Sequence, residues 1–201
     1  MAVRFGVSST VKNRLPRYSN FWDGTAVYSP FSPTGSYDAL ATYTVPSGGV
    51  STITFAGLPT GGQYSHLQIR IMGLYSASNP YGNLRFNDDS SSSYWWHQLQ
   101  GNGSSASASA YGSLGTSIYF PADAVGSSIP TVQIADILDY ASSSKLKTVR
   151  ILEGYDANGS GTLRLSSGLW SATPQAINKI VLTTSTGNFN QYTNVSIYGV
   201  K

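Results

Sequence analysis

The chain contains no cysteine, so it can form no disulfide, no thiolate metal site and no cysteine nucleophile. Charge is also scarce. Charged residues make up 10% of the 201 residues, against about 25% in a typical soluble domain, and Glu153 is the single glutamate. Because solvent-facing helices draw on Glu, Lys, Ala and Leu, this composition argues against long exposed helices. The sequence also has no run of 18 apolar residues and no apolar leader core, so we expect neither a membrane span nor a signal peptide.

Apolar and aromatic residues are plentiful in spite of the low charge. Hydrophobic residues make up 40% of the chain and aromatic residues 12%, which is enough to build a buried core. The polar remainder is rich in Ser, Thr, Asn and Gly, and Val, Ile and Tyr are frequent. These are the residues of strands and turns, so the composition predicts a mostly β protein.

The first 36 residues differ in character from the remainder. They contain three prolines and scattered aromatic residues, and their apolar positions follow neither the strand period nor the helix period. We expect residues 1–36 to form an extended arm that docks either on the chain's own domain or on a partner. The residues expected to make the docking contacts are Arg4, Lys12, Arg14, Arg17, Phe21 and Trp22. Four cations spread over fourteen positions are too sparse for a nucleic-acid site, so we favour a protein partner.

From residue 37 onward, short apolar runs alternate with turn signals. The clearest run is 66–72, in which Leu67, Ile69 and Ile71 alternate with polar residues. Similar runs predict further strands at 40–45, 50–55, 83–87, 94–99, 116–120, 131–137, 147–152, 161–166, 177–183 and 194–199. Residues 134–141 also fit helical spacing, but we interpret them as a strand followed by a turn. The Ser-rich segments 90–93 and 104–115 are expected to be exposed loops or a sheet edge.

This pattern favours one fold class. Many short strands, separated by Gly and Pro and not alternating with helices, are typical of an antiparallel two-sheet β-sandwich. We therefore predict an all-β, jelly-roll-like sandwich of about ten strands over residues 37–201, preceded by the extended arm.

Catalytic and metal-binding patterns are weak. Residues 156–161 resemble the first half of a calcium-binding EF-hand loop, but position 12 is Ser167 where a glutamate is needed, so a tight Asn-Gly hairpin turn is the better interpretation. Asp88 and Asp89 fit a solvated loop, and His66 and His97 are the only histidines. The sequence also carries no nucleophile elbow, nucleotide-binding loop or zinc-protease helix. We predict no catalytic activity, metal or cofactor.

The segment 94–99 is the most informative local feature. In a strand, Tyr94, Trp96 and Gln98 would face one side, and Trp95 and His97 the other, so each face carries a tryptophan. These aromatic residues are either buried within or between chains, or they form a platform on which a sugar ring can stack. The candidate contact residues, for a glycan or for another subunit, are Tyr94, Trp95, Trp96 and His97.

Five segments, in order along the chain, resemble segments of tailed-bacteriophage virion proteins that are described as structural or tail-associated. They are 64–70 (YSHLQIR), 84–89 (LRFNDD), 94–103 (YxxHxLxGNG), 136–150 (DILDYAS and KTVR) and 189–200 (FxQYTxVSIYGV). The opening residues 20–25 (NFWDGT) resemble N-terminal attachment segments that precede such modules.

The resemblance implies a β-sandwich displayed on the surface of a phage particle, and it implies no catalytic residues. We therefore expect a virion structural protein, either a capsid decoration or head spike or a tail fibre component. We expect residues 1–36 to anchor it to other virion proteins. Because phage appendages are commonly symmetric, we expect a homo-oligomer, with a trimer as the preferred state. The alternative is a receptor-recognition module of the tail that binds host glycan in host attachment.

Overall fold

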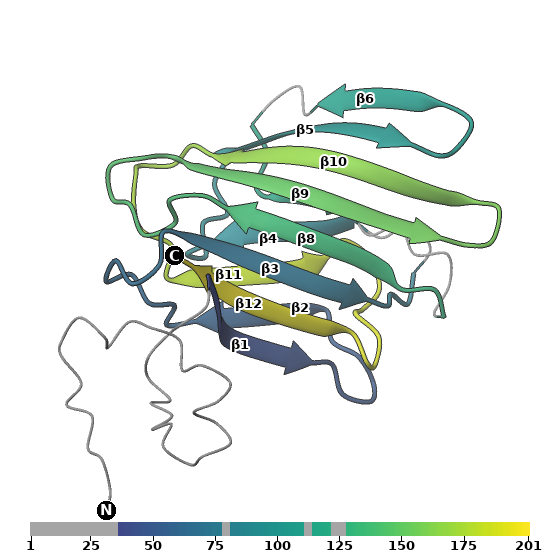
Figure 1. Cartoon of the computed structure of the whole chain (residues 1–201), viewed down its shortest axis with the longest axis horizontal. Helices are drawn as coiled ribbons and strands as arrows, with labels where there is room; N and C mark the ends of the chain where they lie inside the picture. The colour runs from purple at the N-terminus through teal and green to yellow at the C-terminus, as the bar shows by residue number, and fades with distance from the viewer. Residues whose placement is uncertain (1–35, 78–80, 111–113, 122–127) are drawn as a thin grey trace, which may run out of the picture. The chain divides into compact units, whose positions relative to one another are not determined.

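The computed structural model describes residues 36–77, 81–110, 114–121 and 128–201. The described residues form two antiparallel sheets, and no helix among them could span a membrane (Figure 1). The larger sheet has the strand order β1-β12-β3-β8-β9-β10-β5-β6, and the smaller has the order β2-β11-β4-β7. The strands are β1 (Tyr37–Thr44), β2 (Thr52–Ala56), β3 (His66–Gly73), β4 (Tyr81–Phe86), β5 (Tyr94–Gly101), β6 (Ala106–Ala110), β7 (Ile118–Pro121), β8 (Thr131–Ile137), β9 (Lys147–Asp156), β10 (Gly161–Trp170), β11 (Lys179–Thr184) and β12 (Asn194–Val200).

The predicted all-β sandwich is confirmed. Each of the eleven predicted strand segments overlaps an observed strand, and the twelfth strand, β6, comes from the Ser- and Ala-rich segment expected to be a loop or an edge. β6 pairs only with β5 and is an edge of the larger sheet. Residues 131–137 are a strand followed by a turn, as predicted, and not a helix. The predicted arm, residues 1–36, lies outside the described residues apart from Ser36.

The hydrophobic core lies between the two sheets. Period-two alternation places Leu67, Ile69 and Ile71 of β3 on the inner face, each at most 2% exposed. At one end of the core, Trp170 packs on Phe86 and Tyr94 with ring centroids 5.5 and 6.3 Å away. Since these rings come from three strands in both sheets, they join the sheets together.

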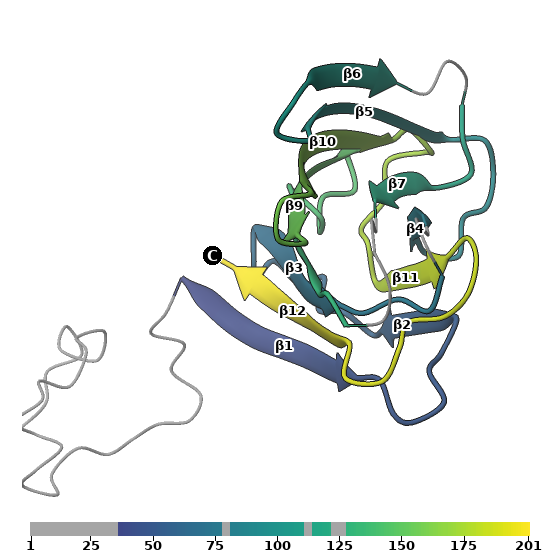
Figure 2. The same cartoon turned by 90° about the vertical axis from the view of Figure 1, so that its right-hand side faces the viewer.

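The larger sheet curves around the smaller one. In Figure 2 it runs from β1 through β9 to β6, and the smaller sheet lies on its concave side. Among the described residues, β7 is the last strand of the smaller sheet at this end, whereas the larger sheet continues past β5 to β6. The inner face of β5 therefore meets the smaller sheet close to its edge, and this meeting shapes the candidate site.

A capped turn leads into β5. The Asp89 carboxylate accepts hydrogen bonds from Ser91 N (2.9 Å), Ser91 Oγ (2.6 Å), Ser93 Oγ (2.7 Å) and Trp170 Nε1 (2.6 Å). Desolvation raises the pKa of Asp89, but the hydrogen bonds from Ser91, Trp170 and Ser93 outweigh it and lower the pKa to about 2. The neighbouring Asp88 accepts a hydrogen bond from Lys179 Nζ at 2.6 Å. Both acids of the predicted solvated loop thus have partners inside the chain.

We expect Asp89 to make the free energy of unfolding of the sandwich depend on pH in the acidic range. Its ordinary pKa of 3.8 falls to about 2 on folding, so the unfolded chain binds more protons between these values. The stabilisation is therefore complete above about pH 4 and is lost as the pH falls toward 2. Asp89→Asn should lower the free energy of unfolding by about 1–3 kcal/mol at neutral pH and flatten its dependence on pH in this window.

Urea unfolding between pH 2 and 6 measures both effects. Asp88→Asn is the matched control, because this adjacent carboxylate is 63% exposed and holds a partner only at the surface. An equal pH dependence in Asp89→Asn and the unmodified chain would contradict the prediction.

Candidate functional site

The two faces of β5 carry the aromatic residues predicted from the sequence. Tyr94, Trp96 and Gln98 point inward, and Trp95, His97 and Leu99 point outward, as the register with β10 requires. Tyr94 lies in the core with no exposed surface, and its hydroxyl donates to the Asp89 carbonyl at 3.1 Å. Of the four candidate contact residues, Tyr94 is therefore not available at the surface, whereas Trp95, Trp96 and His97 are at least partly exposed.

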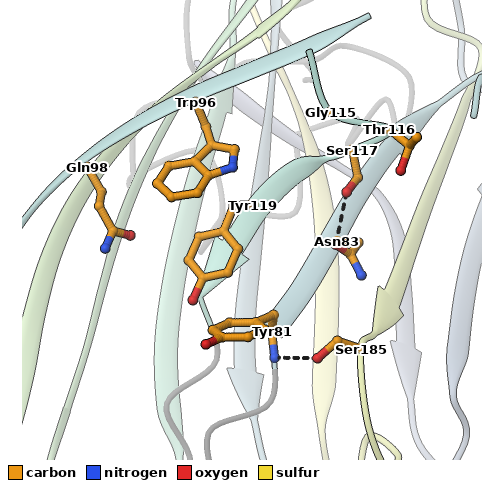
Figure 3. Close-up of a pocket in the computed structure, with 9 residues that line it drawn as sticks. All are labelled: Tyr81, Asn83, Trp96, Gln98, Gly115, Thr116, Ser117, Tyr119 and Ser185. Carbon is orange, nitrogen blue, oxygen red and sulfur yellow. Dashed lines mark hydrogen bonds between the residues drawn. The ribbon is translucent and has the colours of Figure 1, made fainter. Parts of the chain in front are cut away.

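A groove of about 490 Å³ opens where the inner face of β5 meets β4 and β7 (Figure 3). It is the candidate functional site, because it brings aromatic rings, amides and hydroxyls together. Its described lining residues are Tyr81, Asn83, Trp96, Gln98, Gly115, Thr116, Ser117, Tyr119 and Ser185.

Three aromatic rings follow one another along this groove. Trp96 stacks on Tyr119 with ring centroids 4.8 Å apart and an interplanar angle of 26°, and Tyr119 lies 4.9 Å from Tyr81 at 51°. The row joins the two sheets, because Trp96 belongs to β5 and the tyrosines belong to β7 and β4. Tyr81, at the open end, is 50% exposed. The ring faces therefore offer a stepped apolar surface to a ligand in the groove.

Polar groups flank the aromatic row. Asn83 lies opposite Tyr119 across the β4–β7 pair, and its Oδ1 accepts a hydrogen bond from Ser117 Oγ at 2.9 Å. Ser185 Oγ accepts a hydrogen bond from the backbone N–H of Tyr81 at 2.9 Å. The described lining contains amides and hydroxyls but no carboxylate and no cation. Such a surface can stack on a ring and exchange hydrogen bonds with hydroxyl groups.

A buried polar network supports the amide side of the groove. Gln98 Nε2 donates to Gln100 Oε1 (3.4 Å), which also accepts from Arg164 Nε (2.7 Å). Arg164 Nη1 donates to Glu153 Oε1 at 2.8 Å, and the Glu153 side chain is 2% exposed. Gln133 Nε2 donates to the other Glu153 oxygen at 3.4 Å. The groove is thus connected to a charge pair inside the sandwich, which restricts where the Gln98 amide can lie.

The sequence missed Tyr81, Tyr119 and Asn83. A signal for them existed: Tyr81 and Asn83 alternate with buried residues on β4, and Tyr119 lies between two buried residues on β7. That alternation assigns them to the face opposite the core. It does not indicate that β5 of the other sheet curves over them, so their proximity to Trp96 follows from the sheet curvature.

Trp95 and His97 lie on the opposite face of β5, at a second hollow of about 420 Å³. This hollow also contacts Thr148, Ser167 and Leu169. It is separate from the groove, since the β5 backbone lies between the two faces. The four candidate residues predicted together are therefore distributed over the core and two different surfaces.

The remaining candidates from the sequence are the segment 156–161 and the two histidines, His66 and His97. Asp156 Oδ1 accepts from Asn158 N at 2.9 Å in a tight turn with positive φ at Asn158 and Gly159, so the predicted hairpin turn is confirmed. His66 Nδ1 accepts from Asp139 N at 2.9 Å, and three strands of the sheet separate His66 from His97. Over the ranges the structure covers, no three His, Cys, Asp or Glu residues gather as metal ligands.

The six predicted docking residues of the arm lie outside the described residues. Comparison with known proteins adds no assignment: no family model and no curated protein matches the chain.

Proposed function

We propose that the chain is a non-enzymatic structural protein of a bacteriophage virion. In this proposal the sandwich is displayed on the particle surface, as a capsid decoration or head spike or as part of a tail fibre. Residues 1–36 anchor it to other virion proteins through the cations and aromatic residues identified in the sequence.

The observation that carries this proposal is that the segments resembling phage virion proteins pack against one another in the fold. Segments far apart in sequence contact each other: His66 accepts its hydrogen bond from Asp139, and Tyr64 lies over Gly199. A β-carbon at Gly199 would lie 2.5 Å from the Tyr64 ring, so only glycine allows this contact. The resemblance is therefore carried by residues that build one folded domain, which supports a common structural module.

Particles of the encoding phage test the proposal. Mass spectrometry of purified virions should detect the protein, and cryo-electron microscopy should place it on the particle surface. A variant that lacks residues 1–36 should keep the strand-rich circular dichroism of the full chain but fail to join particles. Absence of the full-length protein from virions would overturn the proposal, and normal incorporation of the truncated variant would overturn the anchoring role.

A second candidate function, recognition of host-surface glycan, is favoured by the row of rings formed by Trp96, Tyr119 and Tyr81. Sugar rings stack their C–H faces on aromatic residues, and the amides and hydroxyls beside the row can bond the sugar hydroxyls. The two functions are compatible, because a surface module of a virion can also bind the host. The neutral lining favours a neutral sugar unit.

Trp96→Ala should weaken binding to immobilised host polysaccharide by tenfold or more, because it removes the largest ring of the row. Binding is measured by surface plasmon resonance, with quenching of tryptophan fluorescence as a second readout. Trp95→Ala is the matched control, since it removes the neighbouring tryptophan from the opposite face. Equal losses in both variants, or a loss only in Trp95→Ala, would exclude the groove. Release of reducing sugar during the assay would contradict the non-enzymatic assignment.

A further inference from the structure

Half-exposed aliphatic side chains gather on the outer face of the larger sheet. They form what we term the outer apolar face, which none of the described elements covers. Their exposed fractions run from 48% at Leu152 to 61% at Leu163. The residues of the outer apolar face are Met72, Leu99, Val132, Leu152, Leu163 and Leu165.

Strand register arranges these side chains in two adjacent rows. In the first row, Leu165 of β10 lies directly opposite Leu99 of β5 on one side and Leu152 of β9 on the other. The second row runs from Leu163 on β10, past Gly154, to Val132 on β8 and Met72 on β3. Because directly opposed residues of antiparallel strands project to the same side, the rows form one continuous surface.

This surface is large for a free monomer. Six side chains that each leave about half of their area in solvent expose roughly 600 Å², at the upper limit of the largest apolar patch on a typical monomer. The alanines of β6 extend the same face, since Ala108 lies opposite Leu99 and Ala106 opposite Gly101. Together with the polar residues at its border, the patch has an area that approaches the roughly 800 Å² that each partner buries in a stable complex.

The border of the face carries both signs of charge. Arg150 and Asp136 lie directly opposite each other in the row next to Leu152, on the same side of the sheet. Arg70 of β3 lies on the same side, because its register partner Ile134 is also the register partner of Leu152. Two identical copies that meet through this face would each bring two cations and one anion to the contact. Each copy therefore offers Asp136 to a cation of the other copy, whereas a border with cations alone would repel a second copy.

We propose that the outer apolar face binds a second copy of this chain in a two-fold symmetric dimer, in place of the trimer expected from the sequence. The two-fold axis passes near Leu165 and Leu152, the centre of the first row, so each copy presents the same residues to the other. The leucines form the water-excluded centre, and Arg150 of each copy faces Asp136 of the other. The proposal does not depend on the virion assignment, because any role of the chain leaves this face uncovered by the described elements.

Sedimentation equilibrium of the full chain at about 1–100 μM tests the dimer. The unmodified chain should be a dimer, and the Leu152→Lys/Leu165→Lys variant should dissociate with a dimer Kd more than tenfold higher. Both positions are about half exposed, so circular dichroism should show an unchanged fold. Leu146→Lys is the control, because Leu146 is 43% exposed but lies outside the two rows. It should remain a dimer.

Cross-linking supplies a second readout that does not depend on dissociation. Because the chain has no cysteine, Leu165→Cys introduces the single thiol, and a short bis-maleimide should join two copies at that position. Leu146→Cys should give no cross-linked dimer at the same concentration. A monomeric unmodified chain would overturn the proposal. So would a trimer, or an association that survives both lysine substitutions.

Discussion

Replacing Glu153 with alanine is expected to lower the free energy of unfolding by about 3–5 kcal/mol. The Glu153 and Arg164 side chains are 2% and 11% exposed, and Arg164 Nη1 donates to Glu153 Oε1 at 2.8 Å. Without the carboxylate, the guanidinium keeps its charge in a site from which water is largely excluded. Gln133, which is fully buried, also loses the Glu153 carboxylate as an acceptor of its Nε2 group. The loss therefore combines a cation that has lost its carboxylate partner with a buried amide that has lost a hydrogen bond.

Urea unfolding measures this loss through the transition midpoint, provided that the slope stays constant. The double variant Glu153→Ala/Arg164→Met should recover part of the stability, because it removes the stranded charge. Asp88→Asn is the comparison at the surface, because asparagine tolerates the positive φ of 58° at this position. The pair of Asp88 with Lys179 is as short, at 2.6 Å, but the side chains are 63% and 32% exposed, so less than about 1 kcal/mol should be lost. Equal losses at Glu153 and Asp88 would refute the argument.

The charge pair shows how far the sequence could predict the interior. The Asn158-Gly159 turn was predicted, and a two-residue turn sets the register of its hairpin. Counting outward by five residues places Glu153 opposite Arg164, as the structure has them. The sequence does not indicate that both side chains are buried, because charged residues at the end of a strand normally face water. Their burial depends on Tyr75 and Gln133, which come from distant elements.

Contacts between distant elements also limit how well the sequence predicts the strands and the groove. Period-two patterns found the strands in which branched and aromatic residues alternate, but β6 consists only of Ala and Ser and becomes a strand by pairing with β5. Strand alternation predicted which side of β5 the Trp96 side chain faces. It could not predict the contact between Trp96 and Tyr119, because this contact depends on how closely the two sheets approach each other. Local periodicity carries no information about the distance between the sheets.

The approach of the sheets depends on a glycine beside Trp96. Gly168 of β10 lies directly opposite Trp96 of β5, on the inner face. A β-carbon at Gly168 would lie 2.6 Å from Cγ2 of Ile118 and 2.9 Å from its Cδ1, and Ile118 is fully buried. The missing side chain therefore lets β7 lie against the larger sheet. Since Tyr119 follows Ile118 on β7, the same contact brings the tyrosine under Trp96.

Gly168→Val should consequently impair both stability and the groove. We expect a loss of about 3 kcal/mol, in the upper part of the range for overpacked cores, and a smaller loss for Gly168→Ala. Displacement of β7 should also separate Trp96 from Tyr119, which near-ultraviolet circular dichroism detects, and should weaken polysaccharide binding if the groove is the glycan site.

Two variants separate this effect from a general intolerance of side chains at glycine. Gly101→Ala, also in the larger sheet, should be nearly neutral, because its β-carbon would meet its nearest neighbour, the Ser105 carbonyl oxygen, only at 3.9 Å. Ile118→Ala combined with Gly168→Val should recover stability lost by Gly168→Val alone, since the valine can occupy the space that the isoleucine leaves. If the double variant is as unstable as the sum of the single ones, contact with Ile118 is not what requires glycine at 168, and the position of Tyr119 must have another cause.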